Sequence, residues 1–429
     1  MTNWKEYKLE NVIKVKHGFA FKGAFFSKEP TNDILLSPGN FNIGGGFKAD
    51  KFKYYNGTYP KSYILKEGDI IVTMTDLSKE GDTLGYSAKI PPHKGIKYLH
   101  NQRLGLLQLI DKDFNIDFIY WLLRTREYQH FIVSSATGTT VKHTSPTRIC
   151  EYVFKAPNYN TQTAIAEILS SLDDKIELNN KINQELENLA QTLFKQWFID
   201  FEFPNENGEP YKSSGGEMVD SELGEIPKGW EVGTFGDLCK VVNGYAFKSK
   251  DFEETGSNGI LKIRNVNGSV VDIINTQFVA SDVVTSVQEK FRVLTGHILI
   301  AMTGAEVGKT GIVPETNKSL WLNQRVGRFE PIIENTIVFI YHMFNVLNFT
   351  QSVRNSAMGS AQPNISASGI ESINCIIPPK EISLMFSSIN QDSFNLTLKN
   401  LGENQELAFL RDTILPKLIS GDLSINELD

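Results

Sequence analysis

The sequence predicts two mixed α/β, strand-rich domains joined by two long helices that form an antiparallel coiled coil. The chain of 429 residues is too long for one ordinary hydrophobic core. Its two halves repeat the same short motifs in the same order, and each half ends in a long stretch with heptad spacing. These three observations give a fold with a pseudo-two-fold internal repeat.

The repeat is visible over most of the chain. Its longest piece aligns Trp4–Lys22 with Trp230–Lys248 without a gap. The other matching pairs, in chain order, are Leu36–Asn42 with Leu261–Asn267, Gly68–Thr75 with Gly296–Thr303, Asn101–Arg103 with Asn323–Arg325, Ala136–Thr139 with Ala357–Ser360, and Asn183–Leu186 with Asn404–Leu407. Chance similarity would not keep this order, so the chain contains a duplication.

Each half begins with a globular domain, over residues 1–157 and 227–379. Ile70–Val72 and Ile298–Ile300 predict buried strands because they are short apolar runs of β-branched and aliphatic residues. Gly44–Gly46 and Asn267-Gly268 predict turns. Phe118–Arg126 and Ile337–Leu347 predict short helices, which makes each domain α/β.

Residues 158–200 predict the first long helix, because Gln162–Phe198 contains neither glycine nor proline. Its apolar seam alternates spacings of four and three, with two asparagines near the middle, and comprises Ile165, Leu169, Leu172, Ile176, Asn179, Asn183, Leu186, Ala190, Leu193 and Trp197. A buried asparagine in such a seam costs stability and fixes the register.

Residues 380–429 predict the second helix, whose seam is less regular: Phe386, Ile389, Leu396, Asn400, Leu407, Leu410, Ile414 and Leu418. Pro416 is expected to weaken its last turn. Neither helix can bury its seam alone, so we expect them to pair antiparallel and to hold the two domains at opposite ends of a rod. Residues 201–226 predict an acidic linker.

Charge is distributed unevenly along the chain, whose net charge is −7. Residues 1–157 carry 22 basic and 15 acidic side chains, and residues 227–379 carry 13 of each. The helical and linker segments are acidic, so the two domains are the parts able to approach phosphates. The three widely spaced cysteines predict neither a disulfide framework nor a zinc site.

At this point the sequence resembles the Type I restriction-modification specificity subunits over nearly its whole length. The resemblance is carried by Gly18–Lys22 and its copy, Ile168–Ile176, Leu193–Phe201, Ser221–Trp230 and Leu415–Leu423. It implies two target-recognition domains, each reading half of an asymmetric, bipartite double-stranded DNA sequence. It further implies that the helices set the spacer and dock two methyltransferase subunits, with restriction (translocase) subunits joining the full complex.

The same resemblance implies a non-catalytic chain without a cofactor of its own. S-adenosylmethionine, ATP and Mg²⁺ are then expected in the partner subunits. No apolar run is long enough to span a bilayer and no signal segment is visible, so we expect a cytoplasmic protein without membrane partners.

Candidate DNA contacts fall into three groups. Residues shared by both halves can position DNA: Lys22, Lys248, Arg103 and Arg325. Polar, glycine-bearing loops can approach a backbone closely and contribute Thr139, Thr140, Lys142, Ser360 and Gln362. Base readers should lie where the halves differ, which nominates Lys48, Lys51, Lys53, Tyr54, Lys262 and Arg264. For each residue the alternative is an ordinary solvated or structural side chain.

The sequence leaves two alternatives to DNA reading. One is a coiled-coil adaptor that joins proteins without touching DNA. The other is an enzyme using Gly304–Thr310, which is similar to a P-loop but has three residues, where a P-loop has four, before Gly308-Lys309. Its repeat counterpart lacks the lysine, so the sequence disfavours nucleotide binding.

Overall fold

The computed structural model describes residues 4–138, 140–347, 349–357 and 364–425. The chain forms two compact units, residues 1–173 with 410–429 and residues 174–409. Each unit contains one globular domain and a part of both long helices. Among the residues described, no helix is long and apolar enough to cross a membrane.

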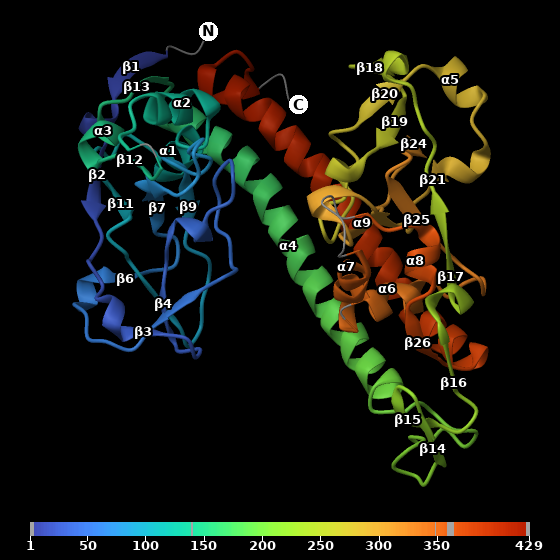
Figure 1. Cartoon of the computed structure of the whole chain (residues 1–429). Coiled ribbons are helices and arrows are strands. Elements are labelled where there is room, and N and C mark those ends of the chain that lie inside the picture. Colours follow the sequence, from blue (N-terminus) through green and yellow to red (C-terminus); the bar gives the residue numbers. More distant parts are fainter. Residues whose placement is uncertain (1–3, 139, 348, 358–363, 426–429) are drawn as a thin grey trace. The chain divides into compact units, whose positions relative to one another are not determined.

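In unit 1 the domain is built on a four-stranded antiparallel sheet and a five-stranded sheet (Figure 1). The four-stranded order is β2 (Ile13–His17), β11 (Leu104–Leu109), β7 (Ile70–Thr73) and β9 (Ser87–Lys89). The five-stranded order is β3 (Phe26–Ser27), β5 (Lys53–Tyr55), β4 (Asp33–Leu35), β10 (Lys97–Leu99) and β6 (Ile64–Leu65), with β4 and β10 parallel. The predicted strand Ile70–Val72 is fully buried in the middle of the first sheet.

Further elements of unit 1 close this domain. They are the pairs β1 (Lys5–Lys8) with β13 (Val153–Ala156) and β8 (Thr75–Asp76) with β12 (Lys142–His143), and helices α1 (Ile116–Leu122), α2 (Arg126–Ser134) and α3 (Pro146–Cys150). The helix predicted over 118–126 is therefore two elements: Asn115 caps the start of α1, and Thr125 caps a new helix at Arg126.

Unit 2 repeats this topology strand for strand. Its four-stranded order is β17 (Cys239–Asn243), β25 (Val326–Pro331), β22 (Ile298–Ala301) and β23 (Thr310–Ile312). Its five-stranded order is β18 (Phe252–Glu253), β20 (Gln277–Val279), β19 (Asn258–Leu261), β24 (Ser319–Leu322) and β21 (Arg292–Val293), with β19 and β24 parallel. The duplication seen in the sequence is thus a duplication of fold.

The remaining elements of this domain follow the same plan. They are β16 (Glu231–Thr234) paired with β26 (Asn374–Ile377), and helices α5 (Ser281–Thr285), α6 (Ile337–Val346), α7 (Phe349–Ala357) and α8 (Ala367–Glu371). Helix α6 matches the predicted helix 337–347 to within one residue. The predicted fold class, two mixed α/β domains with paired long helices, is confirmed.

The two long helices are α4 (Tyr159–Phe198) and α9 (Lys380–Ser420), and each passes from one unit into the other. In unit 2 they run antiparallel. Asn400 Nδ2 donates to Asn183 Oδ1 at 2.8 Å, while Asn179 Nδ2 donates to Asn404 Oδ1 at 2.9 Å. The repeat maps Asn179 onto Asn400 and Asn183 onto Asn404, so each hydrogen bond is the repeat image of the other.

In unit 1 the same helices share a core with the first domain. Ile165, Leu169, Ile414 and Leu418 are all buried in that cluster. Helix α9 continues through Pro416 to Ser420, because Leu418 and the residue after it are held in the core beyond the proline. The expected weakening of the last turn is therefore not seen as an end of the helix.

Three apolar positions predicted for the seam of the second long helix, α9, are not buried, so that prediction is wrong in part. Leu410 is 46% exposed, and Ile389 and Leu396 are exposed too. Around Ile389 and Leu396 the buried face of α9 instead includes Phe394 and Leu398, which belong to the core of the second domain. That domain covers α9 from the side, so the buried face no longer follows the helix–helix seam alone. Among the other seam positions, five are only partly buried: Leu172, Ile176, Leu186, Leu193 and Leu407.

The segment expected to be an acidic linker is ordered. It contains a hairpin of β14 (Met218–Ser221) and β15 (Gly224–Pro227). Phe201 and Phe203 are buried against Trp230, with ring centroids 5.4 and 5.2 Å from the indole. These aromatic contacts join the segment to the core of unit 2. Most of its acidic side chains stay exposed, whereas Glu202 is half-buried and accepts from Ser213 N at 3.0 Å.

Candidate nucleic-acid interface

The motifs that recur in both halves come together in each domain. In the first domain Phe19 N donates to His100 O, and Gln102 N donates to Phe19 O, each at 2.9 Å. A Cβ built on Gly18 would stand only 2.0 Å from Asn101 O. The glycine of the first motif is therefore required by the close approach of the Asn-Gln-Arg motif.

The contacts continue to two further repeated segments. Met74 N donates to Arg103 O at 2.9 Å, and Thr144 N donates to Met74 O at 3.0 Å. Next to this bond His143 pairs with Thr75 in the β8–β12 ladder. Four segments thus lie in the order 18–19, 101–103, 74–75 and 143–144, and we call this arrangement the motif ladder.

The second domain builds the same motif ladder. Tyr245 N donates to Leu322 O and Gln324 N donates to Tyr245 O, at 2.8 and 2.9 Å. Met302 N donates to Arg325 O at 3.1 Å, and Ile365 N donates to Met302 O at 3.0 Å. Thr303 and Asn364 form the bridge that corresponds to Thr75 and His143. Sequence identity at these positions therefore reflects one shared backbone geometry.

Exposed cations lie on this motif ladder or next to it in both domains. Lys22, Arg103, Lys248 and Arg325 are all exposed. No ion pair found among the described residues involves any of these four side chains. A cation without a carboxylate neighbour keeps its full charge available for a phosphate.

Of the five loop candidates, the structure describes Thr140 and Lys142. Thr140 is exposed, and Lys142 is half-buried on β12 opposite Asp76. Thr139, Ser360 and Gln362 lie outside the described residues. Nothing therefore places those three relative to the motif ladder.

The candidates from the divergent regions differ in availability. Lys51 and Lys53 are exposed, whereas Lys48 is half-buried with its Nζ 3.2 Å from Asp50 Oδ2. Tyr54 is half-buried on β5, where it pairs with Ile34 of β4. These side chains therefore border the five-stranded sheet and do not form one cluster of free cations.

In the second domain the two divergent candidates have opposite surroundings. Arg264 is exposed. Lys262 is not: its Nζ lies 3.5 Å from the centroid of the Phe252 ring and donates to Gln277 Oε1. Burial lowers the pKa of the Lys262 ammonium. The structure thus places Lys262 in an internal cation–π contact, which speaks against the predicted DNA-facing role.

Buried polar residues hold each domain together beside the motif ladder. Asn40 Oδ1 accepts from Ser37 N at 2.9 Å, and Asn265 Oδ1 accepts from Lys262 N at 3.0 Å. Both asparagines also donate to carbonyls of the following loop. Sequence reasoning assigned them no role, although their recurrence in both halves was the available signal.

His100, whose carbonyl oxygen accepts the hydrogen bond from Phe19 N, is fully buried. Its Nε2 lies 2.9 Å from Leu104 O. Burial lowers the pKa of His100 to about 4, so the imidazole is neutral near pH 7. It therefore supports the motif ladder as an uncharged hydrogen-bonding group rather than as a cation for DNA.

The first domain is fastened to both helices through one carboxylate. Asp173 of α4 accepts from Arg124 of the first domain and from Arg411 of α9. The Arg124 guanidinium lies 4.3 Å from the centroid of Trp121, whose indole Nε1 donates to Ser170 Oγ at 3.0 Å. Because Arg124 is buried, this network fixes how the domain sits on the helices.

The second domain is fastened to α9 by different chemistry. Gln405 Nε2 donates to Val271 O at 2.8 Å, and Gln405 Oε1 accepts from Ile273 N at 3.0 Å. A Cβ on Gly402 would stand 2.4 Å from Glu315 O, so this helical glycine allows a loop to touch the helix backbone. Neither contact was predicted from the sequence.

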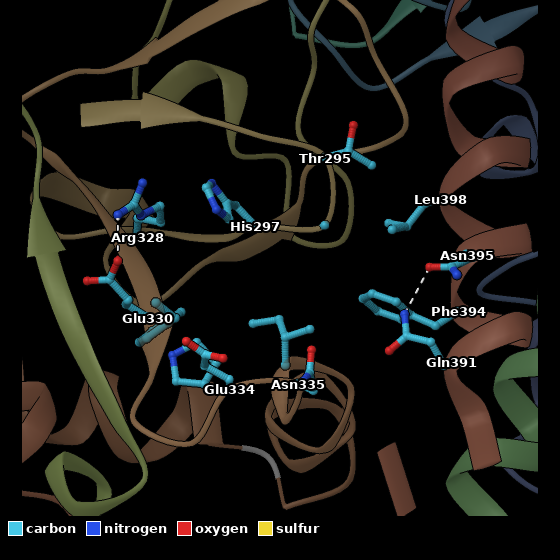
Figure 2. A pocket seen from close by; sticks show the side chains of 14 residues that line it. Thr295, His297, Arg328, Glu330, Glu334, Asn335, Gln391, Phe394, Asn395 and Leu398 are labelled. Carbon is cyan, nitrogen blue, oxygen red and sulfur yellow. Dashed lines mark hydrogen bonds and ion pairs between the residues drawn. The ribbon is translucent and has the colours of Figure 1, made fainter. Parts of the chain in front are cut away.

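A hollow of about 440 Å³ lies between the second domain and α9 (Figure 2). His297, Arg328 and Glu330 stand on one side, and Gln391 and Phe394 of α9 stand on the other. Arg328 Nη2 lies 3.1 Å from Glu330 Oε1, and burial lowers the pKa of His297 to about 4. The basic side chains that line this hollow are thus paired or neutral, which does not suit a phosphate.

The P-loop-like segment does not form a phosphate cradle. Gly304–Glu306 is a 3₁₀ turn, and the Lys309 ammonium is paired with Glu306. A carboxylate at the lysine would repel a nucleotide phosphate. Within the described residues, no group of three or more histidine, cysteine or acidic side chains could hold a metal ion.

Comparisons with known proteins point in one direction. The family model described as the Type I restriction modification DNA specificity domain matches residues 1–188 and 227–408. The HindI specificity subunit of Haemophilus influenzae is 26% identical, over 99% of this chain and 100% of that protein. The MjaIX specificity subunit of Methanocaldococcus jannaschii is 29% identical, over 76% of this chain and 73% of that protein.

Among solved structures, the S subunit of a Type I restriction-modification system from M. genitalium has a similar fold. Its TM-score is 0.57 and its identity is 17%, over 97% of this chain and 96% of that chain. The match extends through both domains and both long helices.

Proposed function

This chain belongs to the family of Type I restriction-modification DNA specificity subunits, and from that premise we propose that each recognition domain reads one half of a bipartite DNA target. One observation carries the proposal. The motif ladder occurs twice with the same backbone geometry, and each copy has an exposed lysine and arginine that form no ion pair with any carboxylate of the described residues.

The chemistry of these cations suits duplex DNA. Phosphates attract lysine and arginine independently of sequence, and such contacts fix the position of a protein on the duplex. Lys22 with Arg103 and Lys248 with Arg325 would supply the same positioning contacts in the two domains. Because the rest of the two domains differs, the two half-sites should differ as well, giving an asymmetric target.

The helices would set the distance between half-sites. Two readers of a duplex must be held about one helical turn apart, roughly 34–36 Å, or a multiple of it. Helix α4 has 40 residues, which at about 1.5 Å per residue span roughly 60 Å, and this is long enough for the task. The symmetric asparagine hydrogen bonds of α4 and α9 would keep that distance constant by fixing their register.

The same helices would dock two methyltransferase subunits. Leu189 of α4 and Leu410 of α9 occupy equivalent positions of the repeat, and both are exposed. Exposed leucines at matched places would give two similar partner sites. Restriction subunits would join through the methyltransferases. S-adenosylmethionine, ATP and Mg²⁺ would act in those partners, and this chain would be non-catalytic.

An adaptor that only joins proteins is the second candidate. The exposed apolar residues of the helices fit an adaptor as well as they fit a DNA specificity subunit, because both would bind partner proteins through them. The unpaired cations on the motif ladder distinguish the two candidates, since a pure adaptor has no use for the same exposed lysine and arginine in both domains.

A binding experiment tests the proposal. The chain would be purified with its methyltransferase subunits, and the DNA that it retains from a randomised duplex library would be sequenced. We expect a bipartite sequence. Replacing Lys22 and Arg103 by alanine should weaken binding to every duplex alike and reduce the slope of log K against log salt by about 1 per lost phosphate contact.

Lys112→Ala is the matched control. Lys112 is exposed in the same domain, but it follows the far end of β11, whereas Arg103 precedes the near end. This control should leave both affinity and salt slope unchanged. Retention of DNA without any sequence preference would reject DNA reading, and an unchanged salt slope in the double variant would reject the motif ladder as the DNA face.

A further inference from the structure

Two positions, one on the motif ladder and one next to it, carry different side chains in the two domains although the backbone pairing around them is shared. The first is the last residue of the edge strand that leads into the glycine motif. It is His17 at the end of β2 and Asn243 at the end of β17. His17 pairs with Gly105 and Asn243 pairs with Gly327, so the backbone places both residues identically.

The second position lies at the other side of the motif ladder. It is His143 in the first domain and Asn364 in the second. His143 lies opposite Thr75, and Asn364 lies opposite Thr303. The sequence repeat aligns the same residues, so sequence and backbone agree on the correspondence.

Both positions are exposed in both domains. Between them lie the shared residues Gln102 and Arg103, or Gln324 and Arg325, which are exposed too. Identical side chains cannot make two domains prefer different bases. Side chains that differ between the domains, at positions where the backbone is the same, are able to give the two domains different base preferences.

Asparagine and histidine side chains present different hydrogen-bonding groups to a base edge. The asparagine amide presents a donor and an acceptor at one end, which matches N6 and N7 of adenine in the major groove. A histidine ring presents its two nitrogens on different sides, so it cannot make that two-point contact with one base edge. His143 also has Nδ1 3.2 Å from Thr75 Oγ1, which leaves Nε2 for a ligand.

We propose that His17 and His143 in the first domain, and Asn243 and Asn364 in the second, are specificity-determining residues for the two half-sites. The second half-site then contains an A·T pair whose adenine is read by asparagine. This inference rests on the proposed DNA-reading function, and it adds which residues distinguish one half-site from the other.

The test exchanges the residues between domains. Two double variants, His17→Asn with His143→Asn and Asn243→His with Asn364→His, would be purified with their methyltransferase subunits. Duplexes retained from a randomised library would be sequenced. Each variant should change the base preference of its own half-site only, by about 5- to 150-fold at the contacted pair, while the other half-site and the spacer stay the same.

The outcomes separate this inference from the proposed function. If the unsubstituted chain selects no sequence, DNA reading itself fails. If it selects a bipartite sequence and both exchange variants select the same one with equal discrimination, the inference is overturned. Lys22→Ala serves as the internal standard, because it should lower affinity without altering the selected sequence. Unchanged thermal unfolding of the variants would show that exposed residues were exchanged without damage to the fold.

Discussion

At the scale of single residues, the most informative positions are those that recur in both halves. Gly18 and Gly244 each face a carbonyl of the Asn-Gln-Arg motif, at 2.0 and 2.1 Å from where a Cβ would stand. Asn40 and Asn265 each tie a loop back onto its own strand. Recurrence in these cases marks a requirement of the fold, and recurrence at Lys22 and Lys248 marks exposed charge.

Gly18→Ala should destabilise the first domain by at least about 1–3 kcal/mol, because its methyl group would force two backbone segments apart. Chemical denaturation followed by a probe in this domain measures the loss. Gly23→Ala is the control, since a Cβ there meets nothing within 4 Å and it should change stability little. Equal stability of the two variants would show that the close approach is not required.

At the scale of elements, the paired helices combine an apolar seam with a polar centre. The hydrogen bonds Asn183–Asn400 and Asn179–Asn404 lie at this centre, and Glu403 adds a bond to Asn179 at 2.8 Å. Buried amides favour the register in which they meet each other, because any other register leaves them without partners.

A double-mutant cycle measures this effect. Asn183→Leu or Asn400→Leu alone should cost about 1–3 kcal/mol, because each leaves a buried amide without its partner. The double variant should cost less than the sum of the two, since both polar groups are gone. Urea unfolding gives the three values. The exposed ion pair of Lys181 with Glu177 is the comparison cycle, where coupling should stay below about 0.5 kcal/mol. Additive losses at the asparagines would contradict a coupled polar pair.

For the molecule as a whole, each compact unit combines one globular domain with parts of both long helices. The boundary falls after Asp173 in α4 and after Phe409 in α9. The two docking networks, Asp173 with two arginines and Gln405 with two backbone groups, each lie within a single unit. Helix length could therefore change at the boundary without breaking either network.

This gives a prediction about the DNA spacer. Seven residues of helical sequence inserted after Asp173, with seven more after Phe409, should lengthen both helices by about 10.5 Å. At about 3.4 Å per base pair, the selected spacer should grow by about 3 base pairs with both half-sites unchanged. Sequencing of retained duplexes measures the spacer. The same insertion after Gly208, an exposed turn, should leave it unchanged, and a constant spacer in the helix variant would refute the ruler.

The architecture could be predicted from the amino-acid sequence. The duplication, the strand Ile70–Val72 and the helix 337–346 are readable because order, hydrophobicity and period are local properties of the chain. The sequence also supplied three of the four pieces of the motif ladder, 18–19, 74–75 and 101–103, as repeated motifs. It could not show that these pieces meet, because hydrogen bonds such as Met74 N to Arg103 O join residues far apart in sequence.

Which candidate side chains are available to a ligand depends on the packing of segments that are distant in the chain. Lys262 is taken up by Phe252 and Gln277, and Leu410 is exposed where a seam position was expected. The segment 201–226 is ordered by aromatic packing on Trp230 despite its acidic composition. In each case burial depends on which distant segment arrives at the same place, and the local sequence does not encode that information.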